Sequence, residues 1–404
     1  MPVSLARRSL TSSATPNPIL ATFMRGGTSK GIYLNRVHLP ADTAAWDPIF
    51  LGMMGSPDPK YGRQLNGMGG GISSLSKVCV VGSPTDEQRA AGIDVAYTFA
   101  QVGIRDEIVD YSGNCGNLSS MIGVFALDEG LVAAPRVCDA DVNAHAPTVT
   151  VSAFNTNTQK RIDTTFPVSL ASGQPIAVLD LEQEAMAGVH GRASRVVLDF
   201  VSPGGARTGK LLPSGQPTDA LPFVSADGVR ADVPASLVDA TNPTVFVPLE
   251  GLRGVLQHSE SVDFTSVPVE LAVEQLRRAG AERMGLDPET QAQPKIAVVS
   301  EPAPDDMEAD IVVHAYSMGV LHKAVPMTVG LCLGVAAGKE GTIPWKIARA
   351  RMGAVSLPHD GEHMVRIRHP GGIVIVGSAA KDGEVTSAKV IRTGRRLMKG
   401  VVWW

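Results

Sequence analysis

Cys115 is the residue of this sequence best placed to do chemistry. It lies in the segment Ser112-Gly113-Asn114-Cys115-Gly116-Asn117, between a predicted strand that ends at Tyr111 and an apolar segment typical of a buried helix. The unpaired N–H groups and partial positive charge of a helix start could stabilise a thiolate or a ligand oxyanion. In the alternative interpretation, Asn114 and Asn117 only cap the helix, and Cys115 is an ordinary small buried residue.

Lys77 is the second candidate, at the start of a predicted apolar strand over residues 77–81. If its ammonium group points inward among apolar neighbours, desolvation favours the neutral form that a general base needs. If it points outward, it is one more solvated lysine. The preceding loop contains Gly69, Gly70 and Gly71 in succession, which indicates close approach of the main chain to a ligand.

A third glycine-rich segment, Arg25-Gly26-Gly27-Thr28-Ser29-Lys30, connects two predicted strands. Its backbone N–H groups, together with Arg25, Ser29 and Lys30, could form a cradle for a carboxylate or a phosphate. It is not a Walker loop, because the required spacing is absent and a strand rather than a helix follows. The alternative is a basic hairpin turn without a ligand.

The elements that must position these residues occur in two similar sets. The strand before Cys115 leads through a turn of small residues into an apolar helix. About 200 residues later, a strand over residues 311–316 leads through Ser317-Met318-Gly319 into an apolar helix over residues 327–337. This repetition predicts two similar domains that face each other.

Length and composition agree with two domains and exclude several classes of protein. A chain of 404 residues exceeds what one core usually serves, and 42 glycines with 28 prolines indicate many turns and short strands. The net charge of −4 gives no global attraction for nucleic acid. No segment is long and apolar enough to predict a membrane span.

The four cysteines, Cys79, Cys115, Cys138 and Cys332, lie far apart, which argues against a zinc site and a disulfide framework. A reducing compartment, the cytoplasm, is the simplest expectation. Residues 1–18 contain Arg7, Arg8 and several hydroxyl residues but no acid. They are expected to be a disordered tail or a leader, and a mitochondrial location is the alternative.

The motifs together resemble the 2-methylaconitate cis/trans isomerase family, which also holds 4-oxalomesaconate tautomerases and aconitate isomerases. The resemblance extends from about residue 20 to the C-terminus. It is carried by Met24-Arg25-Gly26-Gly27-Thr28-Ser29-Lys30-Gly31, Gly67-Met68-Gly69-Gly70-Gly71 with Ser76-Lys77, Ser112-Gly113-Asn114-Cys115-Gly116-Asn117, Gly209-Lys210-Leu211-Leu212-Pro213, Ser317-Met318-Gly319 with His322-Lys323, and His369-Pro370-Gly371-Gly372.

The resemblance implies an α+β fold of the diaminopimelate epimerase type, with two pseudo-symmetric domains, each a curved sheet around a central helix. We expect the domains to be residues 19–190 plus 381–404 and residues 191–380, with the site between the two helix starts. Lys77 and Cys115 match the family's catalytic pair. The substrate-binding residues are expected to be Arg25, Ser29, Lys30, Gly69, Gly70, Gly71, Ser73, Asn114, Gly116, Asn117, Ser317, Met318, His322, Lys323, His369 and Gly371.

The implied reaction is isomerisation of an unsaturated tricarboxylate by proton transfer, and cis-aconitate to trans-aconitate is the specific expectation. 2-Methylaconitate isomerase and 4-oxalomesaconate tautomerase are the alternatives. In this chemistry Lys77 is the base and Cys115 the acid. No metal or organic cofactor is expected, nor a nucleic-acid or membrane partner, and a homodimer stays open.

Two rival functions remain. An amino-acid racemase with two thiols is disfavoured, because Cys332 lies inside the second helix rather than at its start. A noncatalytic carboxylate-binding protein on the same fold is the alternative from another class. Reactivity of Cys115 toward iodoacetamide, with and without a tricarboxylate, would separate an enzyme from such a binding protein.

Overall fold

The computed structural model describes residues 16–138, 146–171, 173–225, 227–256, 262–291, 293–317, 319–322, 324–352 and 361–404. Most of the predicted leader therefore lies outside the described residues. Met318 and Lys323, two of the predicted binding residues, lie outside them as well.

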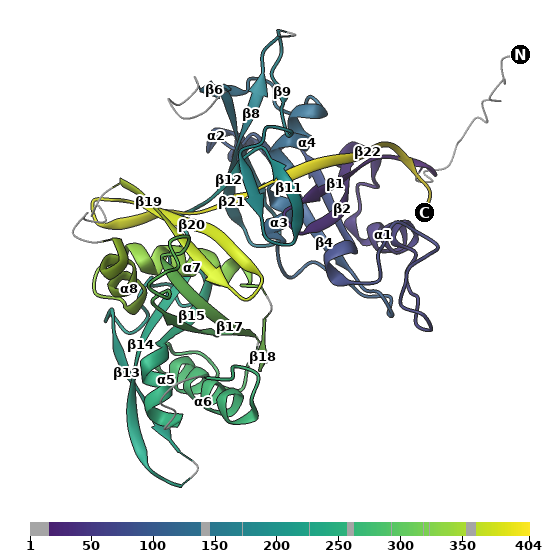
Figure 1. Ribbon diagram of the computed structural model, residues 1–404. Helices are drawn as coiled ribbons and strands as arrows, with labels where there is room; N and C mark the ends of the chain where they lie inside the picture. The colour runs from purple at the N-terminus through teal and green to yellow at the C-terminus, as the bar shows by residue number, and fades with distance from the viewer. Residues whose placement is uncertain are drawn as a thin grey trace, which may run out of the picture.

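The chain has the predicted α+β architecture, in which two halves each wrap a curved sheet around a buried helix (Figure 1). The strands of the first half are β1 (Ile19–Gly26), β2 (Ser29–Asn35), β3 (Lys77–Gly82), β4 (Val95–Val102), β5 (Val109–Asp110), β6 (Arg136–Cys138), β7 (Thr148–Asn155), β8 (Lys160–Ser169), β9 (Ile176–Ala177), β10 (Glu184–Met186) and β11 (Val189–Ala193). The later strands are β12 (Val196–Val201), β13 (Asp219–Val224), β14 (Arg230–Ala240), β15 (Asn242–Pro248), β16 (Lys295–Ser300), β17 (Ile311–Ser317), β18 (Val320–Leu321), β19 (Gly361–His369), β20 (Gly372–Lys381), β21 (Glu384–Arg392) and β22 (Gly394–Val402).

The α-helices of the described residues are α1 (Trp46–Met54), α2 (Asp86–Ala90), α3 (Gly116–Ser119), α4 (Ile122–Asp128), α5 (Leu249–Leu256), α6 (Val267–Arg283), α7 (Met327–Gly338) and α8 (Ile343–Met352). Short 3₁₀ turns cover Arg36–His38, Thr43–Ala45 and Ser73–Leu75.

The buried helix of the first half is broken into α3 and α4, whereas the sequence predicts one helix. The Ser119 hydroxyl donates to the carbonyl of Cys115 over 3.1 Å, and the Ser120 hydroxyl donates to the carbonyl of Asn117 over 2.7 Å. Such side-chain bonds to preceding carbonyls disturb a helical ladder. Leu118, Ile122 and their apolar neighbours are fully buried inside the sheet all the same. The predicted burial is therefore observed around a shorter first helix.

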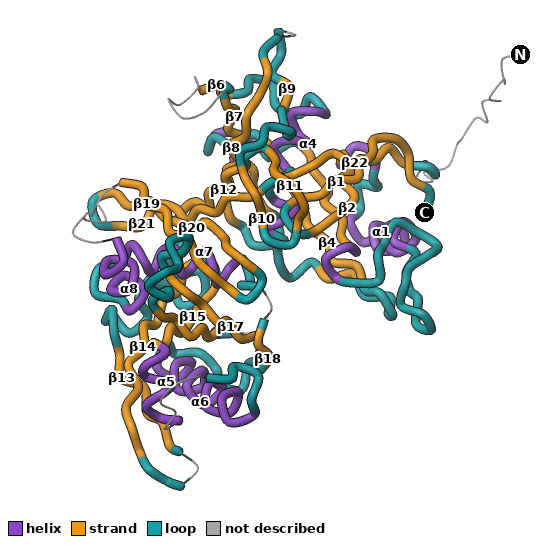
Figure 2. The backbone as a smooth tube through the Cα atoms, in the orientation of Figure 1, coloured by secondary structure: helices purple, strands orange, loops and turns teal. Residues whose placement is uncertain are grey.

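The second half repeats this plan around α7, whose residues from Val329 to Ala337 are buried. Strands β14, β15, β19, β20 and β21 surround the helix. A second apolar cluster forms where α5 and α6 pack on the outer face of β13, β14, β15 and β16 (Figure 2). This layer buries the outer face of the sheet.

Three late strands join the halves into one sheet network. β12 pairs with β8 of the first half on one side and with β21 on the other. β22 then runs along β1, so the last strand returns to the first half, as Figure 1 shows in yellow. Because β12 and β21 belong to both halves, the sheet has no break at the predicted domain boundaries, which remain predictions.

Asp199 makes the strand junction sensitive to pH. Its carboxylate is mostly buried on β12, 3.7 Å from the ammonium group of Lys389 on β21, and one carboxylate oxygen has no partner among the described residues. Burial raises the pKa of Asp199 to about 6, and Lys389 only partly opposes this shift. The folded state therefore binds the proton more tightly than the unfolded chain. This contribution to stability is complete below about pH 4 and is lost as the pH rises through about 6.

We expect Asp199→Asn, which mimics the protonated acid, to raise the melting temperature relative to the natural protein at pH 8 but not at pH 4.5. The gain in the free energy of unfolding is at most about 3 kcal/mol, since one pKa unit corresponds to about 1.4 kcal/mol. Asp163→Asn on β8 is the control. Asp163 forms a bidentate ion pair with Arg161, with both contacts at 2.8 Å, so loss of this pair should destabilise the folded protein at pH 8. A melting-temperature difference for Asp199→Asn that is the same at both pH values contradicts this assignment.

Candidate active site

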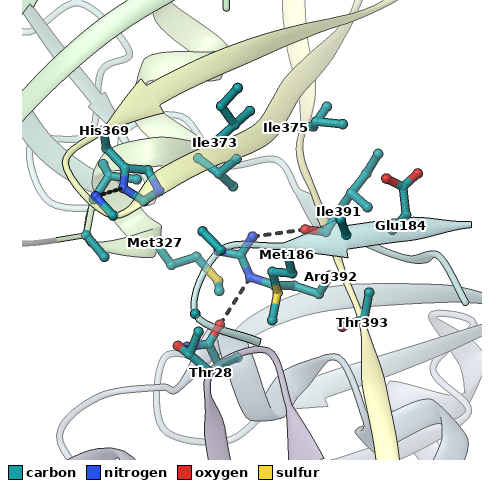
Figure 3. Close-up of a pocket in the computed structure, with 18 residues that line it drawn as sticks. Thr28, Glu184, Met186, Met327, His369, Ile373, Ile375, Ile391, Arg392 and Thr393 are labelled. Carbon is teal, nitrogen blue, oxygen red and sulfur yellow. Dashed lines mark hydrogen bonds between the residues drawn. The ribbon is translucent and has the colours of Figure 1, made fainter. Parts of the chain in front are cut away.

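Two pockets meet where the first residues of α3 and α7 touch. A Cβ atom added to Gly116 would lie 2.0 Å from the sulfur of Met327, so the two helix starts are in direct contact. On one side is a cavity of about 660 Å³ that Cys115 lines, the cysteine pocket. On the other side is a cavity of about 420 Å³ that Arg392 lines, the arginine pocket (Figure 3). Asn117 and Met327 line both.

The cysteine pocket is suited to an anion. None of the described residues that line it is an aspartate or a glutamate, and it contains two cations, Lys160 and Arg207. Its other polar lining residues are Ser112, Asn114, Cys115, Asn117, Asn157, Thr158, Thr241, Asn242, Gln293 and Thr328. With donors and cations on its walls and no carboxylate among its described lining residues, the pocket favours a ligand that carries negative charge.

The polar groups around Cys115 are held in place by buried partners. Cys115 precedes α3, is half-buried, and its sulfur lies 3.9 Å from the hydroxyl oxygen of Ser29. The side-chain oxygen of Asn114 lies 3.2 to 3.4 Å from the hydroxyls of Tyr97 and Ser119 and from the side-chain NH2 group of Asn155. These contacts orient the amide, and its own NH2 group has no partner among the described residues. Asn114 can therefore donate to a ligand beside Cys115.

Lys77 is buried, with 8% of its surface exposed, so the inward orientation is the one observed. Its ammonium group donates a hydrogen bond to the side-chain oxygen of Gln101 and lies 5.1 Å from the centre of the Phe99 ring. Gln101 is fixed in turn by donating to the carbonyls of Ser73 and Ser76. Lys77 is not among the lining residues of either pocket.

The charges of Lys77 and Cys115 both influence the pKa of the buried Cys79 thiol. It shares one face of β3 with Lys77, since alternate residues of a strand point to the same side. Burial raises the pKa of the Cys79 thiol well above its usual range, a charge on Cys115 adds to this effect, and Lys77 opposes it. Lys77 and Cys115 therefore both act on one buried thiol, although only Cys115 reaches a pocket.

The turn between β1 and β2 places Thr28 in the lining of the arginine pocket, whereas Ser29, the first residue of β2, lines neither pocket. The side-chain NH2 group of Asn117 donates to the hydroxyl of Thr28 over 3.1 Å and to that of Ser29 over 3.5 Å. Arg25 instead donates to Gly27 and to Thr393, and Lys30 lies 5.9 Å from the Phe23 ring. Arg25 and Lys30 line neither pocket.

The glycine-rich loop approaches the protein itself rather than a cavity. Added Cβ atoms on Gly69 and Gly70 would lie 2.4 Å from the Gln64 side chain and 2.5 Å from Leu75. Gly71 has a φ of +71° and donates to Gln64 over 2.9 Å. Gly69, Gly70, Gly71 and Ser73 line neither pocket. Their connection with the site runs through Gln101, which binds Ser73 and Lys77.

In the second half, His369 and Gly371 line the arginine pocket. The backbone N–H of Gly371 donates to Nδ1 of His369 over 3.0 Å. Burial and the Arg392 cation lower the pKa of His369, so near pH 7 the ring is neutral and carries its proton on Nε2. Ser317 ends β17. His322 lines neither pocket. Burial lowers the pKa of His322, and the positive charge of Lys295 lowers it further.

Within the described ranges, no group of three or more His, Cys, Asp or Glu residues is arranged to hold a metal ion. No helix in those ranges is both long and apolar enough to cross a membrane.

A family model described as "PrpF protein" matches residues 17–404, almost the whole chain. The chain belongs to the PrpF family. The chain is 34% identical over 406 residues to the 3-methylitaconate isomerase of Eubacterium barkeri, which covers 95% of this chain and 97% of that relative. It is also 34% identical over 415 residues to the 2-methyl-aconitate isomerase of Shewanella oneidensis, covering 95% and 96% of the two chains.

Among solved structures, the crystal structure of a methylitaconate-delta-isomerase superposes with a TM-score of 0.79. It is 32% identical to this PrpF-family chain, and the match covers 96% of each. The family resemblance that the motifs indicated is thereby confirmed.

Several pocket residues of this PrpF-family protein lie outside the motifs that the sequence offers. Thr241 and Asn242 lie at the turn between β14 and β15, and Thr328 is in the first turn of α7. Arg392 ends β21. Its one sequence signal is the charge that follows the apolar pair Val390-Ile391, and its burial is seen only in the folded structure.

Gly26 offers a test of how tightly the Thr28 turn must hold α3. A Cβ atom at Gly26 would lie 2.3 Å from the backbone oxygen of Asn117, so Gly26→Ala forces the turn and α3 apart. We expect a loss of about 1–3 kcal/mol in stability from overpacking. Because Asn117 moves, turnover should fall by up to about 100-fold. The control is Gly400→Ala on β22, where an added Cβ has open space. Equal activity and melting temperature for the two variants would refute this role of Gly26.

Proposed function

We propose that this protein isomerises an unsaturated polycarboxylate by moving an allylic proton, without a metal or organic cofactor. The observation that carries the proposal is the cysteine pocket, which places Cys115, the free amide NH2 of Asn114 and two cations around one cavity with no carboxylate on its described walls. The isomerase names of the PrpF-family relatives support the reaction class.

In the proposed reaction, a base removes a proton from the CH2 group between a carboxylate and the double bond. The resulting dienolate spreads its charge onto the carboxylate at the far end of the double bond. The former double bond is then partly single and can rotate. Return of the proton to the same carbon gives cis/trans isomerisation, and return to the far carbon gives an allylic shift.

The described residues can supply the groups that this chemistry needs. The backbone N–H groups of Gly116 and Asn117 open α3 and have no partner within the helix. With the free amide NH2 of Asn114, they would stabilise the developing oxyanion. Cys115 is proposed as the proton carrier on the pocket wall. Lys77 is proposed as the base, which requires its flexible side chain to turn from Gln101 toward the pocket when substrate enters.

For the substrate, the relatives favour the alternatives over the cis-aconitate expected from the sequence. Their names specify methylated substrates, 3-methylitaconate and 2-methyl-aconitate. We therefore propose 2-methylaconitate as the first substrate to test and keep cis-aconitate as the second.

Incubation with 2-methylaconitate, cis-aconitate, oxalomesaconate and 3-methylitaconate, followed by proton NMR, tests this proposal. The expected result is conversion of at least one of them, fastest for 2-methylaconitate. If the protein binds these acids but converts none of them, the proposal is wrong and a noncatalytic carboxylate-binding protein takes its place.

A further inference from the structure

Arg392 is a buried cation that has no carboxylate partner in the described part of the chain. Only 8% of its surface is exposed, yet no described aspartate or glutamate pairs with it. Arg277, at 2% exposed, shows the usual solution, since Glu274 binds its guanidinium with two contacts of 2.7 Å. A buried charge is costly unless it is paired. The uncompensated charge of Arg392 therefore requires an explanation.

The guanidinium of Arg392 has N–H donors for which no described residue supplies an acceptor. Its Nε donates to the side-chain oxygen of Asn117 over 3.1 Å, and Nη1 donates to the carbonyl of Ile391 over 2.9 Å. No described residue accepts from Nη2. Burial lowers its pKa to about 10, so the group still carries its charge at neutral pH. Arg392 thus presents a charged, partly unsatisfied donor to the arginine pocket.

Two further donors face the same cavity. Figure 3 shows His369 on one side of Arg392 and Thr28 on the other. His369 accepts on Nδ1, so its Nε2–H can donate. The Thr28 hydroxyl accepts from Asn117, and its hydrogen can donate as well. The acid in the lining, Glu184, is bound by Arg195 at 2.5 Å and leaves the Arg392 charge uncompensated.

The other walls of the arginine pocket are largely apolar, with Val325, Ile373, Val374, Ile375 and Ile391. A fitting ligand therefore has one carboxylate on a short carbon chain. Asn117 and Met327 line both pockets, and a charge on Cys115 acts on Arg392. The two pockets are thus close enough to hold different ends of one small molecule.

We propose that Arg392, with His369 and Thr28, binds one carboxylate of the substrate and selects tricarboxylates over dicarboxylates. This inference rests on the proposed function, because it places the third carboxylate of that substrate in the arginine pocket while the reacting carbons lie beside Cys115. A bidentate guanidinium–carboxylate pair supplies both charge and geometry.

The test uses tricarballylate, the saturated tricarboxylate, as a ligand that cannot react, and glutarate as the dicarboxylate. Binding is measured by calorimetry and by the shift in melting temperature for the natural protein, Arg392→Met, Arg392→Lys and the control Arg89→Met. Arg89 lies on the exposed helix α2 and lines neither pocket. We expect Arg392→Met to bind tricarballylate roughly 10- to 100-fold more weakly, the range for loss of a charge-assisted pair. Arg392→Lys should recover part of the loss.

The melting temperature separates this role from a structural one. Because Arg392→Met removes a buried unpaired charge, we expect the ligand-free variant to melt no lower than the natural protein, while its stabilisation by tricarballylate disappears. Binding of glutarate should change by less than about 3-fold, a small part of the loss seen for a charged pair. A variant that melts lower but keeps its tricarballylate affinity overturns the proposal, as does a natural protein that does not bind tricarballylate.

Activity distinguishes failure of this subsite from failure of the proposed function. Tricarballylate binding that depends on Arg392, in a protein that converts none of the test acids, supports the subsite and rejects the isomerase. Conversion of a tricarboxylate with an unchanged KM in Arg392→Met rejects the subsite and leaves the isomerase in place.

Discussion

Lys77→Ala is expected to lower turnover by roughly 10²–10⁴-fold, the contribution of a general base. Lys77 is buried, bonded to Gln101 and without a carboxylate partner in the described part of the chain, which is unusual for a lysine with only a packing role. The substrate KM should change less than kcat, because the missing group acts in the proton-transfer step. Steady-state kinetics on the best substrate of the panel measure both.

The control for Lys77→Ala is Lys60→Ala, since Lys60 is exposed beside Tyr61 and lines neither of the two site pockets. Near-normal turnover of Lys77→Ala would place the base elsewhere. Of the three histidines that could then serve, His314 is stacked on Phe264 at 3.6 Å and His322 lines neither pocket. His369 would become the next residue to test.

Cys115→Ala is expected to produce the second large loss of turnover, again roughly 10²–10⁴-fold, if the thiol carries the proton. Cys115→Ser should be milder, because a hydroxyl can take the same position and donate a proton. The thiol should also react with iodoacetamide and be protected by tricarballylate, which would occupy the cysteine pocket.

The exposed Cys138 must be controlled for in that experiment, because it would be alkylated regardless of ligand. Cys138→Ala should keep full activity and leave Cys115 as the accessible thiol, since Cys79 and Cys332 are buried. Two results together would contradict a catalytic role of Cys115: alkylation that tricarballylate does not slow, and normal turnover of Cys115→Ala. Cys115 would then only line the pocket.

The sequence predicts the local parts of the site well. The junction at Cys115 combines a strand, small residues and an apolar helix within about 20 residues, so local rules place the thiol at a helix start. The repeated plan around residues 311–337 predicts the second half for the same reason. The sequence alone does not decide whether Lys77 points inward, because alternate strand faces differ in burial only after the sheet has formed.

The remainder depends on contacts between distant residues. Arg392 meets Asn117 across 275 positions of the chain, and only the return of β21 and β22 to the first half brings them together. The glycines at 69–71 show a different problem. The sequence predicts close approach of this loop to a ligand, a role that stays a prediction, and the structure shows Gly69 packed closely on the buried Gln64 side chain and Gly70 on Leu75. A glycine run indicates that the backbone must come close to something, without indicating what.

The most direct test of the central claim is the rate of isomerisation of a substrate deuterated at the CH2 carbon, followed by proton NMR in ordinary water. If an allylic proton is transferred, the deuterated substrate should isomerise more slowly than the unlabelled one, and hydrogen should replace deuterium at that carbon when the base exchanges with solvent. The slower rate is expected even if the base returns the same deuteron. Equal rates with both deuterium atoms retained would contradict proton transfer and would favour addition of the Cys115 thiol to the double bond, followed by rotation and elimination.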